Sequence, residues 1–142
     1  MWYRAYTLAE VNDLFALNMT GYLGIKATSI ADGQIVAEMP ISDRVKQPYG
    51  LLHGGASVVL AESVGSIASN MLIDSDIYAG VGLEVNANHI RSVTKGMVTA
   101  ICKPYHIGKT THVWDIQILN ERKQLVCISR LTIAIIKKPT DK

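Results

Sequence analysis

The segment from Ala56 to about Ile73 constrains the fold more than any other part of the chain, because it predicts one long helix made largely of small residues. The small residues fall on most sides of that helix: Ala56, Ser57, Ala61, Ser63, Gly65, Ser66, Ala68 and Ser69. A helix that is small or apolar on most sides is enclosed by the rest of its protein. The pattern therefore predicts a central helix around which a sheet can wrap closely.

Most of the remaining chain has strand patterns. Two strands, Tyr22–Ile30 and Gln34–Met39, are expected to form a hairpin at Asp32-Gly33, a strong turn signal. Four more strands are expected after the helix: Tyr78–His89, Met97–Tyr105, Thr111–Leu119 and Leu125–Ile136. This order predicts an α+β fold in which an antiparallel sheet curls around the long helix. Such a sheet has open edges, and oligomerisation is one way to cover them.

A short amphipathic helix is expected before the first strand. Thr7-Leu8-Ala9-Glu10 has the pattern of a capping box, in which Thr7 caps the helix and Glu10 reaches back to it. The residues at helical spacing are Leu8, Val11, Leu14, Phe15 and Asn18, and Gly21 and Gly24 are expected to end the helix.

Composition narrows the class of protein. A chain of 142 residues predicts one domain, residues 1–142, and 49% apolar residues can supply its core. The formal charge of +2 is too small to indicate a nucleic-acid partner, and no stretch is long and apolar enough to span a bilayer. Cys102 and Cys127 lie in apolar runs without metal-ligand spacing, which indicates buried thiols. With no signal-peptide pattern either, we expect a cytoplasmic protein without a membrane partner.

The residues best suited to chemistry lie between Gln47 and Ser66. His53-Gly54-Gly55 is expected at the start of the long helix, where the first N–H groups lack intrahelical partners and the helix dipole places positive partial charge. A carbonyl oxygen there would be polarised, which makes the Gly55 N–H a candidate oxyanion donor worth about 3 kcal/mol in the transition state. A glycine required only by the turn would explain the same residue.

A carboxylate, Glu62, follows two turns later within an apolar run and is expected to share this reacting site. A carboxylate is costly to bury without partners or a task. Its functional role would be to attack a carbonyl carbon or to activate water for that attack, and its structural alternative is a buried group that accepts hydrogen bonds.

The other candidates also have two interpretations each. His53 could donate to a ligand or cap the helix, and Gln47 could hold a carbonyl or a water or be an ordinary loop residue. Ser66 shares the helix face of Glu62, where it could orient water or simply pack against the sheet. His89 and Arg91 alternate along a strand and so point to one side, either toward a phosphate or into solvent.

The sequence resembles one known family over nearly its whole length. The run Gln47-Pro48-Tyr49-Gly50-Leu51-Leu52-His53-Gly54-Gly55-Ala56, followed by Leu60-Ala61-Glu62-Ser63, is similar to the hotdog-fold acyl-CoA thioesterases of the PaaI-like branch. The similarity extends through residues 81–91, Lys103-Pro104, His106, Gly108, Val113-Trp114 and Ser129-Arg130-Leu131. The H-G-G-x(6)-E element is specific in this context.

The resemblance implies an antiparallel sheet wrapped around a central helix, and hydrolysis of aryl- or acyl-CoA thioesters. An aromatic acyl group such as 1,4-dihydroxy-2-naphthoyl, a thioester of menaquinone synthesis, is the expected substrate. The resemblance also implies a homo-oligomer, either a dimer or a dimer of dimers, whose active sites lie between subunits. Glu62 of one chain would then face Gln47, His53 and Gly55 of another.

At the level of single residues, the resemblance implies one set of catalytic residues and one set of residues that contact coenzyme A. The catalytic residues are Glu62, Gly55, His53, Gln47 and Ser66. The coenzyme A contacts are Gly82, His89, Ile90, Arg91, Ser92, His106, Ile107, Gly108, Lys109, Thr110 and Thr111. In the second set, Gly108 and Lys109 suit a phosphate that is approached by backbone and by charge. No cofactor is expected, because coenzyme A is part of the substrate, and no residues have zinc spacing.

Two other functions are compatible with these residues. One is hydrolysis of thioesters on an aryl carrier protein, which would remove misloaded groups from a synthetase. The other is a non-catalytic acyl-CoA-binding module or a dehydratase of the same fold, since fold does not determine function. The His-centred motif that hotdog dehydratases share is not present, and a binding module would leave Glu62 without a task in its apolar run.

Overall fold

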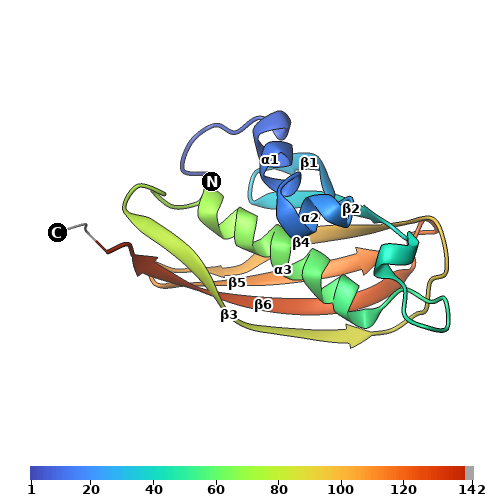
Figure 1. Cartoon of the computed structure of the whole chain (residues 1–142). Helices are drawn as coiled ribbons and strands as arrows, with labels where there is room; N and C mark the ends of the chain where they lie inside the picture. Colours follow the sequence, from blue (N-terminus) through green and yellow to red (C-terminus); the bar gives the residue numbers. More distant parts are fainter. Residues whose placement is uncertain (140–142) are drawn as a thin grey trace.

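The computed structural model describes residues 1–139, in which a six-stranded antiparallel sheet has the order β1-β2-β4-β5-β6-β3 and helix α3 lies across one of its faces (Figure 1). The strands are β1 (Lys26–Ala31), β2 (Gln34–Pro40), β3 (Tyr78–His89), β4 (Met97–Ile107), β5 (Thr111–Leu119) and β6 (Leu125–Lys137). The predicted α+β fold is confirmed. Residues 140–142, which the expected single domain includes, lie outside the described range.

The long helix is the central element that the small residues predicted. α3 spans Gly54–Met71, so it begins two residues before the predicted start and ends two residues before Ile73. Its small side chains allow the sheet to approach closely. At Gly65 an added Cβ would lie 2.5 Å from Cδ2 of Leu131 on β6, so a larger residue there would require the buried Leu131 side chain or α3 itself to move.

The core fills the space between α3 and the sheet. Strands β2, β4 and β5 alternate between buried and half-buried residues over most of their length, as expected for a sheet with one face against a core. Trp114 on β5 is among the largest fully buried side chains. Both thiols, Cys102 and Cys127, are free and buried, as predicted.

The N-terminal region differs from the prediction in one respect. The capping box of Thr7 and Glu10 is present and opens α1 (Leu8–Phe15). The helix does not continue to Gly21, because Leu17 is extended, with φ of −83° and ψ of 141°. Asn18, which follows it, adopts a positive φ of 51°, a conformation that Asn tolerates better than most residues. A second short helix, α2 (Asn18–Tyr22), follows, and the first strand therefore begins at Lys26 rather than at Tyr22.

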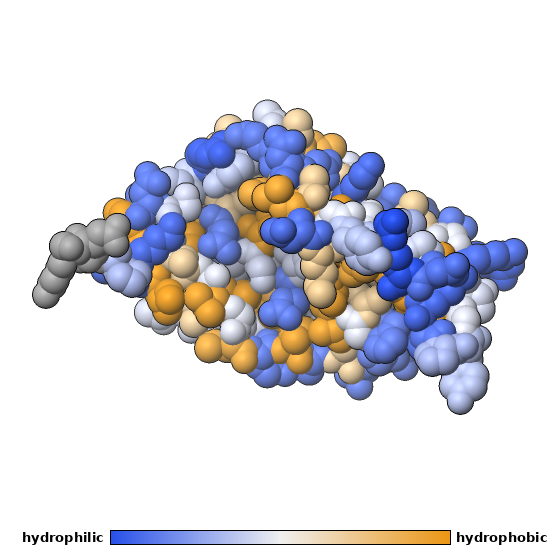
Figure 2. Space-filling model, in the orientation of Figure 1, coloured by the Kyte–Doolittle hydropathy of each residue, from blue (hydrophilic) through white to orange (hydrophobic). Residues whose placement is uncertain are grey.

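Strand β3 forms one edge of the sheet. Within the described residues it pairs only with β6, and it carries a bulge between Gly82 and Glu84. Several large apolar side chains on or beside it are exposed: Ile77, Tyr78, Val81, Leu83 and Ile90. Apolar surface is visible along the lower edge of the molecule, where Figure 1 places β3 (Figure 2). No helix among residues 1–139 has the length and apolar character needed to cross a membrane.

Candidate active site

The start of α3 is capped by His53. Its Nδ1 accepts a hydrogen bond of 2.8 Å from the backbone N–H of Gly55, so the structure gives His53 the capping role, one of its two expected roles. When the ring is neutral, this leaves the proton on Nε2, which can donate to a ligand. A substrate carbonyl would share the Gly55 N–H with the His53 ring or take its place.

Glu62 lies half-buried on α3 and faces strand β3. An added Cβ at Gly82 would lie 2.8 Å from Oε1 of Glu62, so the absent side chain makes room for the carboxylate. Among residues 1–139, no donor forms a hydrogen bond or an ion pair with this carboxylate. The structural alternative for Glu62 was a carboxylate held by hydrogen bonds from neighbouring groups. The described chain does not hold the carboxylate in this way. Gly82, expected among the coenzyme A contacts, lies beside Glu62 of its own chain.

Glu62 and Gly55 are not brought together within one chain. They are seven residues apart on one helix, which corresponds to about 10 Å along its axis. A carbonyl polarised at Gly55 is therefore out of reach of the Glu62 carboxylate of the same subunit. The prediction that these groups share one reacting site is wrong for the single chain, because they lie on the same rigid element.

One cavity joins two of the predicted residue groups. It has a volume of about 320 Å³ and is lined by Gln47, the helix start at Gly54 and Ser57, and residues 89–92, namely His89, Ile90, Arg91 and Ser92. The loop fixes Gln47, because its Oε1 accepts the backbone N–H of Tyr49, which leaves its side-chain NH₂ free to donate. The His89 ring packs on Gly54, where a Cβ would lie 2.8 Å from Nε2.

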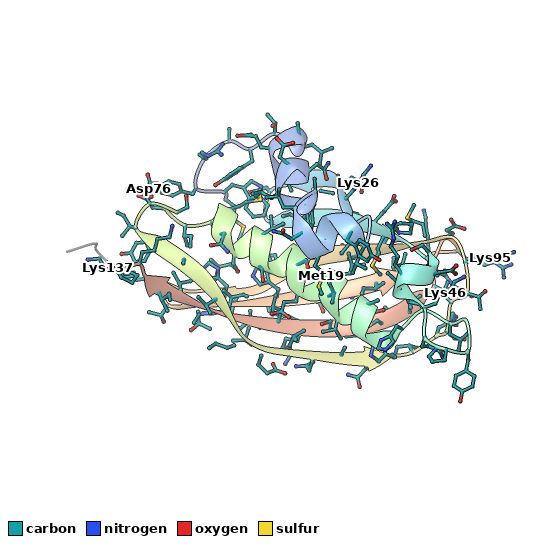
Figure 3. All side chains as sticks on the ribbon, in the orientation of Figure 1. Met19, Lys26, Lys46, Asp76, Lys95 and Lys137 are labelled. Carbon is teal, nitrogen blue, oxygen red and sulfur yellow. The ribbon has the colours of Figure 1, made fainter. Side chains whose placement is uncertain are left out.

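The other predicted coenzyme A segment lies at the opposite end of the sheet. Residues 106–111 form the turn between β4 and β5. Thr111 pairs with Ala134 on β6, and Ala134 pairs on its other side with Val81 on β3. Eight residues of extended chain separate Val81 from His89, or about 25 Å. Lys95, just beyond residues 89–92, and Lys137 mark these two ends (Figure 3).

A buried polar network connects α3 to that turn. Ser69 Oγ accepts a hydrogen bond of 2.7 Å from Trp114 Nε1 and lies 3.2 Å from His112 Nδ1. The His112 ring is 2% exposed and meets the Trp114 ring edge-on. We did not predict this network. The only signal was that His112 and Trp114 alternate on β5 and so share a face with the core.

The network predicts a pH dependence of stability. Burial, the dominant cause, lowers the pKa of His112 below its usual value, so the native state keeps the ring neutral at pH values where the unfolded chain binds a proton. The contribution of the neutral His112 ring to the free energy of unfolding is complete above about pH 6.5. As the pH falls below that value this contribution is lost, by at most about 1.4 kcal/mol per pH unit. Urea unfolding between pH 5 and 8 measures this slope. His112→Gln should flatten this slope, and equal slopes in wild type and His112→Gln would contradict the assignment.

Ser66 lies one turn after Glu62 and faces a different cavity, formed with the N-terminal segment. Among the described residues, no group of three or more His, Cys, Asp or Glu side chains could hold a metal ion.

Comparison with known proteins identifies the relatives of this chain. Residues 49–127 match the model of the thioesterase superfamily. The chain is 48% identical over 136 residues to the 1,4-dihydroxy-2-naphthoyl-CoA hydrolase of Escherichia coli, with 96% of this chain and 99% of that protein covered. It is 47% identical over 116 residues to the protein of the same name from Listeria monocytogenes, with 82% and 94% covered.

Solved structures agree with this relationship. A variant of a thioesterase from Pseudomonas aeruginosa superposes with a TM-score of 0.94 at 44% identity, covering 96% of this chain and 99% of that one. A thioesterase from Haemophilus influenzae superposes with a TM-score of 0.91 at 40% identity, covering 96% and 94%.

Proposed function

Because the chain belongs to the thioesterase superfamily and is an acyl-CoA thioesterase, we propose that its substrate is an aromatic acyl-CoA, 1,4-dihydroxy-2-naphthoyl-CoA or a close analogue. The relatives from Escherichia coli and Listeria monocytogenes carry the name of that activity at 48% and 47% identity. This substrate would place the protein in menaquinone synthesis. The buried thiols Cys102 and Cys127 fit a reducing cytoplasm, in which we place the activity.

The observation that carries the mechanism is the Glu62 carboxylate, which has no hydrogen-bond or ion-pair partner among residues 1–139 and lies beside the bare backbone of Gly82. A carboxylate with free oxygens can attack the thioester carbonyl carbon and expel coenzyme A as the thiolate, which takes a proton from solvent, and the mixed anhydride that remains is cleaved by water. Alternatively, it takes a proton from a water that attacks the carbonyl, and that proton then leaves with the thiol. Both routes yield the free acid and coenzyme A.

The carbonyl oxygen would be polarised at the start of α3. The Gly55 N–H and the dipole of the eighteen-residue helix supply positive partial charge there, and the Nε2–H of a neutral His53 ring is a second donor at this helix start. Donors fixed before the reaction begins stabilise the charge that develops on the oxygen. Gln47, whose side-chain NH₂ borders the adjoining cavity, is the third donor of this set.

The distance between the two groups favours a site shared by two subunits. Glu62 lies about 10 Å along the helix from Gly55, so a partner's helix start must supply the polarising donors. The exposed apolar edge strand β3 is the surface that we propose for this pairing, since it lies against Glu62 and lacks a second neighbour within the described chain. A dimer, or a dimer of dimers, satisfies this requirement.

The same pairing would unite the two coenzyme A segments. Residues 89–92 border the Gln47 cavity, whereas residues 106–111 lie about 25 Å away in the same chain. In an antiparallel pair of β3 strands, the 106–111 turn of one subunit approaches the 89–92 segment of the other. One coenzyme A could then contact Arg91 from one chain and Gly108 and Lys109 from its partner.

The experiment that tests the proposed function is thiol release from a panel of CoA thioesters. The panel contains 1,4-dihydroxy-2-naphthoyl, benzoyl, hydroxybenzoyl, phenylacetyl and medium-chain fatty acyl groups. We expect kcat/KM for the aromatic members to exceed that for the fatty acyl members by at least about tenfold, a difference of about 1.4 kcal/mol in transition-state binding. A preference for fatty acyl groups would contradict the aromatic assignment. If the acyl group is released faster from an aryl carrier protein than from the same acyl-CoA, the physiological substrate would be the acylated carrier protein rather than the acyl-CoA.

A further inference from the structure

A second cavity lies between the N-terminal segment and the C-terminal half of α3. It has a volume of about 490 Å³, within the range of small-molecule sites. The residues that carry the argument are Arg4, Tyr6, Leu14, Ser66, Ile67 and Met71. Figure 1 shows α1, which carries Leu14, lying beside this half of α3. We call this cavity the N-terminal groove.

We propose that the N-terminal groove binds the acyl group of the thioester, and that Tyr6, stacked by Arg4, is the residue that makes the site selective for planar aromatic acyl groups. This inference rests on the proposed function, because it assigns a place for the acyl group relative to Glu62.

The groove begins one helical turn from the reacting carboxylate. Ser66 lies one turn after Glu62 on the same helix face, about 6 Å further along the axis. An acyl group whose carbonyl carbon meets Glu62 can therefore extend along α3 toward Ser66 and Ile67. Its far end would reach Met71, which is 2% exposed and closes that end of the groove.

The wall opposite α3 is flat and held in place. The Arg4 guanidinium lies 3.9 Å from the centroid of the Tyr6 ring. Arg4 Nη1 is also 3.0 Å from the Glu10 carboxylate and donates to the backbone oxygen of Ala5. Glu10 balances the charge of Arg4, so the stacked Arg4–Tyr6 pair adds an aromatic ring to the wall without an unpaired cation. A planar ring in the substrate can pack on this plane or against its edge.

The segment that carries this wall is attached to the rest of the protein at both ends. Tyr3 donates its backbone N–H to Met71 and its hydroxyl to Asp74, both at 2.9 Å. Trp2 Nε1 donates to the backbone oxygen of Ala31 at 3.0 Å. On the other side the capping box of Thr7 joins the segment to α1. The groove is therefore formed before any ligand arrives, which reduces the entropic cost of binding.

The groove also accounts for an exposed apolar side chain. Leu14 is 51% exposed although it lies on the helix face that borders the groove. An aromatic acyl group seated between Tyr6 and Ile67 would cover part of Leu14.

The test uses Tyr6→Ala with Tyr22→Ala as the matched control. Tyr22 is also stacked by an arginine, Arg44, whose Cζ is 4.6 Å from its ring centroid, but it does not line the groove. For each variant, kcat/KM is measured with benzoyl-CoA, 2-naphthoyl-CoA and octanoyl-CoA. Tyr6→Ala should lower the ratio of aryl to octanoyl kcat/KM by about tenfold, the upper range of an aromatic pair. Tyr6→Phe should preserve the ratio, because the ring remains, and Tyr22→Ala should leave it unchanged.

Equal losses on aryl and octanoyl substrates in Tyr6→Ala, or an unchanged ratio, would overturn the proposal. If Tyr6→Ala does not fold, Leu14→Arg, at an exposed position of the same groove, should lower the same ratio by obstructing the groove. A second measurement separates this proposal from the proposed function. Calorimetry with non-hydrolysable ketone analogues of naphthoyl-CoA and octanoyl-CoA should show the same selective loss in Tyr6→Ala. If the wild type cleaves no thioester but Tyr6→Ala selectively loses binding of the naphthoyl analogue, the proposed function fails and the assignment of the groove as the acyl site holds. If Tyr6→Ala shows no selective loss of binding, the assignment of the groove fails.

Discussion

Glu62→Gln is expected to lower kcat for hydrolysis of an aromatic acyl-CoA by about a thousandfold or more, in the upper range for removal of a catalytic acid or base. Glutamine has nearly the same shape but can neither attack a carbonyl carbon effectively nor accept a proton from water. The Glu62 carboxylate has no hydrogen-bond or ion-pair partner among the described residues, so its loss should not disturb the fold. Initial rates of thiol release, with thermal melting as a check of folding, measure the effect.

The matched control for this variant is Glu121→Gln. Glu121 is an exposed carboxylate in the turn between β5 and β6, away from the proposed interface, and its side chain forms no hydrogen bond or ion pair among the described residues. It should retain turnover within about threefold, since substitutions at such surface positions have small effects. Turnover of Glu62→Gln within tenfold of the wild type would remove Glu62 from the mechanism. Single turnover in H₂¹⁸O then separates the two routes, because only the nucleophilic route labels Glu62.

The second large effect is expected from mixing two inactive variants. If each site takes Glu62 from one subunit and the polarising residues from another, the double variant Gln47→Ala/His53→Ala should restore activity to Glu62→Gln when the two are unfolded together and refolded. In random dimers half of the molecules are mixed and each has one intact site, so the mixture should recover about a quarter of the wild-type activity. Each parent alone should remain far below this value.

The physical reason is the rigidity of α3. Gly55 and Glu62 lie on one helix about 10 Å apart, and no side-chain rotation brings a carbonyl at one within reach of the other. Refolding each parent separately before mixing provides the control and should give no recovery until subunits exchange. A refolded mixture no more active than its parents, or an active monomer at high dilution, would show that one chain forms a complete site.

Much of this protein follows from its sequence. The small residues of α3 predicted an enclosed helix, because few side chains on it are large enough to hold a sheet away. The Asp32-Gly33 turn, the capping box of Thr7 and the later strands follow local rules, and each is present within a few residues of its expected place. The His53-Gly54-Gly55 and Glu62 pattern was sufficient to indicate the family and its chemistry.

Only the tertiary structure decided how these residues are placed relative to one another. Local rules did not show that the chain would become extended at Leu17, that His53 would accept the Gly55 N–H, or that His112 would lie beside Ser69. They also did not show that Gly82 accommodates Glu62, or that the two coenzyme A segments lie at opposite ends of the sheet. These relations depend on strand order and register, which bring together residues far apart in the chain. Periodicity specifies which face a residue occupies, and only packing specifies what lies opposite that face.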